Sequence, residues 1–78
     1  MSNPNYLQKR RPEKNEHRFY HIQVCAGVFG DWAVVREWGW FGSPGTVRSS
    51  WFNQEADAVV AAEQWRLRKM KDGYRPLG

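Results

Sequence analysis

Residues 31 to 52, DWAVVREWGWFGSPGTVRSSWF, decide the fold because they read as two strands joined by a turn. The segments DWAVVREWGWF and TVRSSWF are rich in valine, tryptophan and phenylalanine, which favour strands. The connecting GSPGT suits a type II turn, with Pro44 at its second position and Gly45 at its third, where φ is positive. The stretch therefore predicts an antiparallel hairpin.

The first strand of this hairpin has two distinct faces, because successive side chains in a strand point to opposite sides. One face is predicted to carry Trp32, Val34, Arg36, Trp38 and Trp40. The other is predicted to carry Ala33, Val35, Glu37, Gly39 and Phe41. A bulge at Gly39 would shift this assignment, since glycine inside a strand often marks one.

A further strand is predicted upstream, at residues 19–25. FYHIQVC alternates apolar and polar side chains with a period of two, the pattern of a half-buried strand. The AGVFGD segment that follows contains two glycines and is expected to form the loop that leads into the hairpin.

One helix is predicted downstream, from Gln54 to about Lys71, because this segment is rich in helix formers and lacks glycine and proline. Asn53 is expected to cap its start and Gly73 to end it. Its apolar side is expected to contain Val59, Ala62 and Met70, flanked by Val60, Trp65 and Leu67. The predicted fold class is α+β, with one helix packed across a small twisted antiparallel sheet.

The leading residues 1–18 are predicted to be a flexible basic arm, because they contain almost nothing apolar. The domain proper is expected to occupy residues 19–76. The arm has five basic and two acidic residues, a net charge of +3, out of a net +4 for the 78 residues. Since the last turns of the helix are basic as well, a polyanion would be attracted to both ends of the chain.

The length and composition also limit the size of the core and indicate the cellular location of the protein. A chain of 78 residues forms one small domain with a thin core. Its single cysteine, Cys25, excludes an intramolecular disulfide and favours a reducing cytoplasmic location. No apolar run approaches the roughly 20 residues that would span a bilayer, and no signal peptide is expected, so no membrane partner is predicted.

Enzymatic chemistry finds little support in the sequence. His17 and His21 are the only histidines, and neither stands beside a recognisable nucleophile motif. The histidine, cysteine and acidic residues lack the spacing of metal ligands. We therefore expect no catalytic residue, cofactor, metal or small-molecule substrate.

A nucleic-acid interface is the favoured function, because aromatic side chains interleaved with arginine on a sheet face form a stacking platform. The predicted binding residues are Arg36, Trp38, Trp40, Arg48, Lys69, Lys71, Lys9, Arg10 and Arg11. Two alternatives stay open at this point. The two tryptophans would also serve as core residues, and indoles paired with arginine are equally typical of a module that binds another protein.

Three segments resemble the WGR domain family in order and spacing: FYHIQV, VVREWGWFGSPG and DAVVAAEQWRLRKMKDGY, which together cover residues 19 to about 76. The family is named for a Trp-Gly-Arg triplet, and its helix typically ends in a lysine with Gly-Tyr a few residues later. The residues that carry the resemblance are Arg36, Trp38, Gly39, Gly42, Gly45, Lys69, Gly73 and Tyr74.

The resemblance implies a binding role without catalysis. WGR domains occur in DNA-damage-activated poly(ADP-ribose) polymerases and in small bacterial proteins. In the polymerases they contact the 5′ end of broken DNA, with the motif tryptophan against the terminal sugar. That role would fall on Trp38, whereas the position of the motif arginine is occupied by Trp40. This replacement removes a guanidinium capable of bidentate pairing with phosphate.

Overall fold

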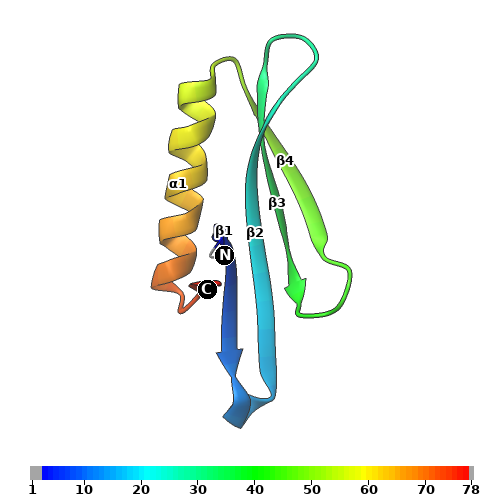
Figure 1. Cartoon of the computed structure of the whole chain (residues 1–78), viewed down its shortest axis with the longest axis vertical. Helices are drawn as coiled ribbons and strands as arrows, with labels where there is room; N and C mark the ends of the chain where they lie inside the picture. Colours follow the sequence, from blue (N-terminus) through cyan, green and yellow to red (C-terminus); the bar gives the residue numbers. More distant parts are fainter. Residues whose placement is uncertain (1–2, 78) are drawn as a thin grey trace.

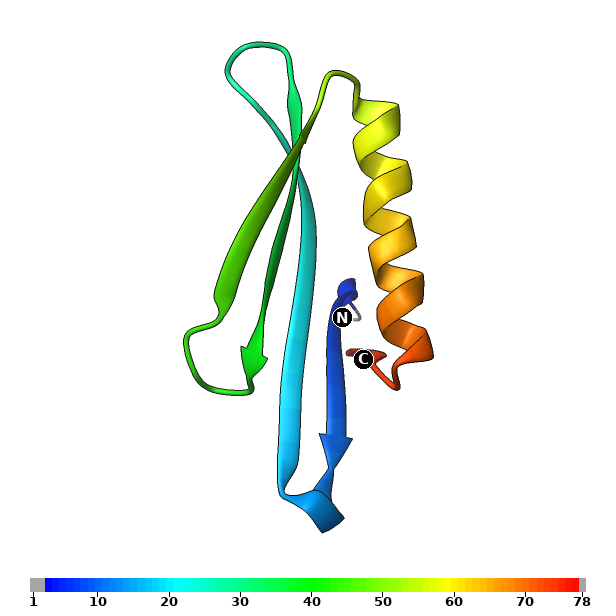
Figure 2. The same ribbon diagram turned by 180° about the vertical axis from the view of Figure 1, so that it is seen from behind.

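The structure is a computed structural model that describes residues 3–77 (Figure 1). Its elements in chain order are β1 (Asn3–Arg11), the 3-10 turn η1 (Pro12–Lys14), β2 (Glu16–Ala26), β3 (Trp32–Trp40), β4 (Thr46–Phe52), α1 (Glu55–Lys71) and β5 (Arg75–Leu77). The strands form one antiparallel sheet in the order β4-β3-β2-β1-β5, and α1 lies across one of its faces (Figures 1 and 2). The predicted α+β fold with one helix across a small antiparallel sheet is confirmed.

The predicted hairpin is present, with a different turn. β3 and β4 pair without interruption from Trp32 opposite Phe52 to Trp38 opposite Thr46, and the pairing of β3 with β2 runs through Gly39, so this glycine marks no bulge. The turn is centred on Gly42, whose φ of 85° fits the third position of a type II turn. The Ser43 N–H donates to the Trp40 carbonyl across it, at 3.1 Å.

Gly45 is required for a reason other than the predicted positive φ. Its Cα lies so close to neighbouring side chains that an added Cβ would be 2.7 Å from Cγ of Glu37 and 2.8 Å from Cζ of Phe19. The hairpin tip therefore folds over Phe19, which is buried although it lies on the face of the sheet away from the helix.

The predicted flexible arm is wrong for the described residues, because β1 occupies most of it. β1 pairs with β2 from Tyr6 opposite His21 to Arg11 opposite Glu16, and with β5 on its other side. Leu7 is fully buried in the core. A strand with few apolar side chains is ordered here because its backbone pairs on both sides and its one leucine is shielded completely.

The core lies between the sheet and α1. Its buried residues are Leu7, Tyr20, Ile22, Val34, Ala58 and Tyr74. Packed against them are the half-buried side chains of Val24, Trp32, Trp38, Phe52, Ala61, Ala62 and Trp65. The sheet supplies the large side chains, so the helix presents mainly alanines to it.

This arrangement corrects the predicted apolar side of the helix. Val59, Val60 and Leu67 are exposed, while Ala58 is buried and Ala61 contacts the core. The composition of the segment predicts a helix, yet its largest apolar residues do not mark the buried side. The bulk of Tyr20 and the tryptophans on the sheet leaves room only for small residues at the closest approach.

The helix ends are also defined by the structure. α1 begins at Glu55 after Gln54, so the expected cap at Asn53 is wrong by one residue, and no side chain caps the helix. At the other end the Gly73 N–H donates to the Met70 carbonyl and the Tyr74 N–H to the Lys69 carbonyl, both at 3.1 Å. With a φ of 101° at Gly73, this is a Schellman ending, as the glycine predicts.

Candidate nucleic-acid interface

The strand register builds the candidate site from two parallel rows of side chains on the helix-covered face of the sheet. One row runs across β1, β2 and β3 as Leu7, Tyr20 and Trp38. The adjacent row runs across the same strands as Lys9, Arg18 and Trp40. Because these rows lie two residues apart along each strand, their side chains point the same way.

The first row belongs to the core. Leu7 and Tyr20 are buried, and Trp38 packs against the core with its ring stacked on Tyr20 at a centroid distance of 5.8 Å and an interplanar angle of 20°. Trp38 is therefore a half-buried residue at the margin of the core. The interleaved pattern of aromatic residues and arginine suggests two freely exposed indoles, but of the two only Trp40 is exposed.

The second row lies where the helix no longer covers the sheet. Figures 1 and 2 show the β1–β2 end of the sheet extending beyond the C-terminal end of α1. Trp40 is 50% exposed, and Cζ of Arg18 lies 4.3 Å from its ring centroid. This distance is that of a cation–π contact, which holds the indole and the guanidinium against each other at the surface.

The end of α1 adds a further cation beside these rows. Nζ of Lys69 lies 4.9 Å from the ring centroid of Tyr20 and 5.7 Å from that of Tyr74. Nζ of Lys9 lies 5.7 Å from the same Tyr74 ring. We call the surface formed by Lys9, Arg18, Trp38, Trp40 and Lys69 the basic aromatic surface.

One carboxylate lies at the margin of this surface. Glu16 accepts a hydrogen bond from Nε of Arg18 at 2.8 Å, and Nε of Arg11 is 3.6 Å from its other oxygen. The hydrogen bond from Arg18 holds the pKa of Glu16 below its usual range, so this carboxylate is ionised at neutral pH. It offsets part of the positive charge of the two arginines and leaves the two lysines unpaired by any described acidic residue.

A second group of cations surrounds Trp65 of the helix. Cζ of Arg36 lies 3.9 Å from the Trp65 ring centroid, and Cζ of Arg68 lies 5.0 Å from it. Arg48 of β4 is directly opposite Arg36 in the sheet register. Arg36 also lies 5.7 Å from the Trp38 ring, which connects this group to the basic aromatic surface.

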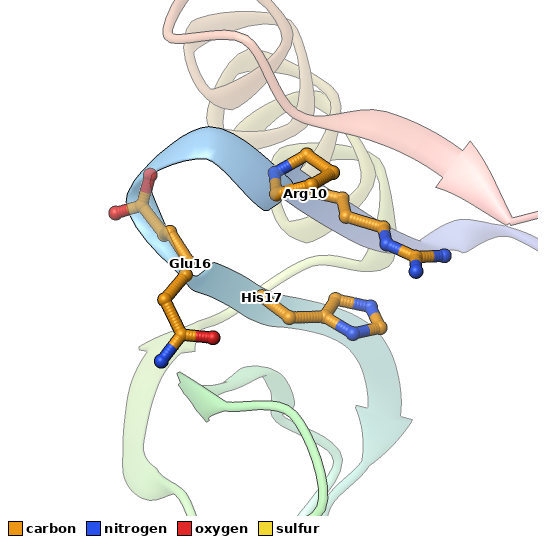
Figure 3. Close-up of a pocket in the computed structure, with 5 residues that line it drawn as sticks. Arg10, Glu16 and His17 are labelled. Atoms are coloured by element: carbon orange, nitrogen blue, oxygen red, sulfur yellow. The ribbon is translucent and has the colours of Figure 1, made fainter.

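Two predicted residues lie apart from these groups. Arg10 projects from the opposite face of the sheet, where it lines a shallow pocket beside His17, and Figure 3 shows the two side chains pointing the same way from neighbouring strands. The His17 ring stacks on Phe41 at 4.1 Å. Lys71 is exposed at the last residue of α1, beside Arg68.

The structure thus brings together Lys9, Trp38, Trp40 and Lys69, and it groups Arg36 with Arg48 in a neighbouring cluster. Arg11 is engaged by Glu16. Sequence reasoning missed Arg18 as a site residue, although its position two residues before Tyr20 already placed it on the same strand face. The predicted arm ends at Arg18, and the predicted strand begins only at Phe19.

Neither a metal site nor a membrane span is found in the described part of the chain. Residues 3–77 contain no group of three or more histidine, cysteine or acidic residues placed to hold a metal ion. The helix within the same range is too short and too polar to cross a bilayer.

A model of the WGR domain matches residues 4–78, nearly the whole chain. The chain belongs to the WGR domain family. It is 35% identical over 71 residues to an uncharacterized protein, y4dW, of Sinorhizobium fredii (strain NBRC 101917 / NGR234). That similarity covers 91% of this chain and 35% of the relative, so the chain spans about a third of that protein's length. No solved structure matches the chain.

The family match agrees with the structure on where the domain begins. The family match starts at residue 4 and so includes β1, whereas the motifs that resemble the family begin at residue 19. In proteins related to poly(ADP-ribose) polymerases the WGR domain is a nucleic-acid-binding module, and it is a binding domain with no catalytic role of its own. The Trp-Gly pair of the family name is Trp38-Gly39 here, and Trp40 follows it.

Proposed function

We propose that this WGR domain is a non-enzymatic module that binds nucleic acid through the basic aromatic surface. The observation that carries the proposal is the Trp40 ring, half exposed and held at 4.3 Å by Arg18 on the part of the sheet that α1 leaves uncovered. A ring in this position offers a flat apolar surface to a base or sugar, and stacking of this kind is worth about 1–3 kcal/mol per base.

The surrounding charges supply the contacts that phosphates need. Lys9 of β1 lies in the same cross-strand row as Arg18 and Trp40. Lys69 at the end of α1 lies over the Tyr20 ring in the adjacent row. Each lysine that neutralises a phosphate on duplex DNA releases counterions, so binding would weaken with salt. Cζ of Arg36 lies 5.7 Å from the Trp38 ring, with Arg48 opposite it on β4, so these two arginines would extend the contact along a longer strand.

Arg18 offers a substitute for the missing motif arginine. Trp40 occupies the position of that arginine, and the guanidinium of Arg18 reaches the same place from the neighbouring strand. Nε–H of Arg18 donates to Glu16, so its terminal N–H groups are the ones that would pair with phosphate. The finer proposal, which rests on the resemblance to family members that contact broken DNA, is that the favoured nucleic acid is DNA with a free end or a nick.

The test is a titration of fluorescein-labelled duplexes followed by anisotropy, with blunt, 5′-phosphorylated, nicked and single-stranded DNA at two salt concentrations. We expect Trp40→Ala to weaken binding about tenfold or more, because it removes the stacking surface. The matched control is Trp51→Ala, since Trp51 is 60% exposed but projects from the opposite face. Lys9→Gln should reduce the slope of log K against log salt by about 0.9.

Three results would oppose the proposal. Equal effects of Trp40→Ala and Trp51→Ala would remove Trp40 from the interface, and an affinity that does not change with salt would remove the phosphate contacts. Equal affinity for blunt, nicked and single-stranded DNA would remove the preference for ends. Circular dichroism of each variant shows that the fold is retained.

A second function, binding of a protein, is favoured by a different part of the molecule. β4 forms a free edge of the sheet. Beside it lie Arg36, Arg48 and Arg68, none of which forms a salt bridge with a carboxylate of the described residues. This edge lies outside the row that contains Trp40, and Arg36 connects it to Trp38 of the basic aromatic surface.

A further inference from the structure

The sheet has two edges, and only one of them is long enough to accept another strand. β5 forms one edge with three residues, and one of these is Pro76. β4 forms the other with seven residues, Thr46–Phe52, which pair with β3 without interruption. Natural proteins usually protect an edge with proline, charged side chains such as lysine, a bulge or a covering element. β4 has no proline, lysine or bulge, and its one charged residue is Arg48. In both ribbon views the end of β4 that follows the hairpin turn lies on the outside, away from α1, and the other end leads into the helix (Figures 1 and 2).

One side of this edge is cationic. Arg48 is exposed on β4, directly opposite Arg36 on β3, and Arg36 is stacked on Trp65 together with Arg68. Like charges directly opposite one another in a sheet are destabilising. Within residues 3–77 none of the three arginines forms a salt bridge, and Nε of Arg36 is buried without a hydrogen-bond partner.

The other side of the same edge is apolar. Val47 and Trp51 project from the face away from the helix and are 57% and 60% exposed. They lie two residues to either side of Ser49 on the strand. An added strand would therefore meet Arg48, between Thr46 and Ser50, on one face, and Val47 and Trp51 on the other.

We propose that β4 binds an extended acidic segment of a protein partner, which adds to the sheet as a sixth strand. Its backbone would satisfy the free N–H and C=O groups along β4, as in other cases of strand addition. A carboxylate opposite Arg48 would face its guanidinium, with Arg36 one strand further into the sheet, and the intervening apolar side chains would cover Val47 and Trp51.

The charges decide against a second copy of this chain as the occupant. Two β4 strands paired antiparallel about Ser49 would place an arginine of each copy on the same face, at the diagonal distance of about 7–8 Å. This would add positive charge to a group that already has too few carboxylates. A nucleic acid would supply negative charge to the arginines, but its sugar–phosphate chain has no peptide groups to complete the edge.

The test uses two synthetic peptides of the same composition and charge, Ac-EVEVEVE-NH2 and Ac-EEVVVEE-NH2. Only the first places every carboxylate on one face of a strand. The probe is ¹⁵N-labelled protein, followed by amide shifts and by hydrogen exchange of the β4 amides. We expect the alternating peptide to bind about tenfold more tightly than its isomer and to slow exchange along β4.

Charge reversal makes the test sharper. The variant Arg48→Glu replaces an exposed residue and should lower the affinity for the acidic peptide while creating affinity for Ac-KVKVKVK-NH2. Trp40→Ala should leave peptide binding unchanged, which separates this site from the nucleic-acid surface. The proposal would be overturned if Arg48→Glu left the affinity for the acidic peptide unchanged. It would also be overturned if Trp40→Ala weakened peptide binding.

Two further outcomes would also overturn it. The two acidic isomers would bind equally if charge alone attracts them, with shifts spread around Lys9 and Lys69. The β4 amides would already be protected in a concentration-dependent dimer if a second copy occupies the edge, and sedimentation of the free protein would show that dimer.

Discussion

Trp38 and Trp40 have the same side chain and project from the same face of the sheet, yet their structural roles differ. Trp38 stacks on the buried Tyr20 at 5.8 Å and closes the margin of the core. Two residues further along β3 the helix has ended, so Trp40 is half exposed and meets Arg18 instead. The role of an aromatic residue in this domain is therefore set by whether α1 reaches its row of the sheet.

Gly45 provides a prediction at the same scale. Gly45→Ala should lower the free energy of unfolding by about 1–3 kcal/mol, because the new methyl group would overlap Glu37 and the ring of Phe19. Urea denaturation measures the change, and Ser43→Ala in the same exposed turn is the control with an effect near zero. Equal effects of the two substitutions would contradict the close approach at Gly45.

At the scale of elements, β1 shows that a strand is not always visible in its own composition. Its charges, Lys9, Arg10 and Arg11, resemble those of a solvated tail. The strand is ordered because β2 and β5 pair with it on both sides and because Leu7 fills the core. The fold therefore depends on a segment whose sequence alone predicts disorder.

Leu7→Ala tests the role of β1 directly. We expect the free energy of unfolding to fall by about 2–5 kcal/mol, the usual cost of truncating a fully buried leucine. Leu67→Ala makes the same chemical change on the helix, where the side chain is 47% exposed, and should cost less than about 1 kcal/mol. Thermal or urea unfolding compares them. A flexible arm would instead give no effect at Leu7.

At the scale of the whole molecule, the charges and the aromatic rings are arranged around the end of the helix. Lys9 and Lys69 approach the Tyr74 ring from β1 and from α1. Tyr74 itself follows the Schellman ending and is buried against Tyr20, with ring centroids 6.1 Å apart. One cluster thus joins the end of α1, the core and the proposed binding surface.

This cluster predicts how stability depends on pH. Burial raises the pKa of Tyr74 above its ordinary value of 10.0, because the phenolate is poorly solvated there. Since the folded-state pKa is the higher one, this contribution to stability is complete below pH 10 and is lost as the pH rises through the folded-state value. Unfolding measured from pH 8 to 11 should show a smaller loss in Tyr74→Phe than in the parent. Identical pH profiles would contradict the assignment.

The hairpin, the helix and the α+β class could be predicted from local patterns, because alternation, turn glycines and helix propensity act over a few residues. Strand alternation also predicts that Trp38 and Trp40 share one face of the sheet, and the resemblance to the WGR family marks Trp38 and Lys69. Their part in binding stays a prediction.

Only the tertiary structure decided which residues of these elements are covered. The pairing of β1, the burial of Leu7 and the contact between Arg18 and Trp40 all join segments distant in sequence, and no local pattern encodes such distances. The end of α1 sets the boundary between core and surface on the sheet, because the row of Tyr20 lies beside the helix and the row of Arg18 lies beyond it. The free edge at β4 follows from strand order, which is likewise a property of the assembled sheet.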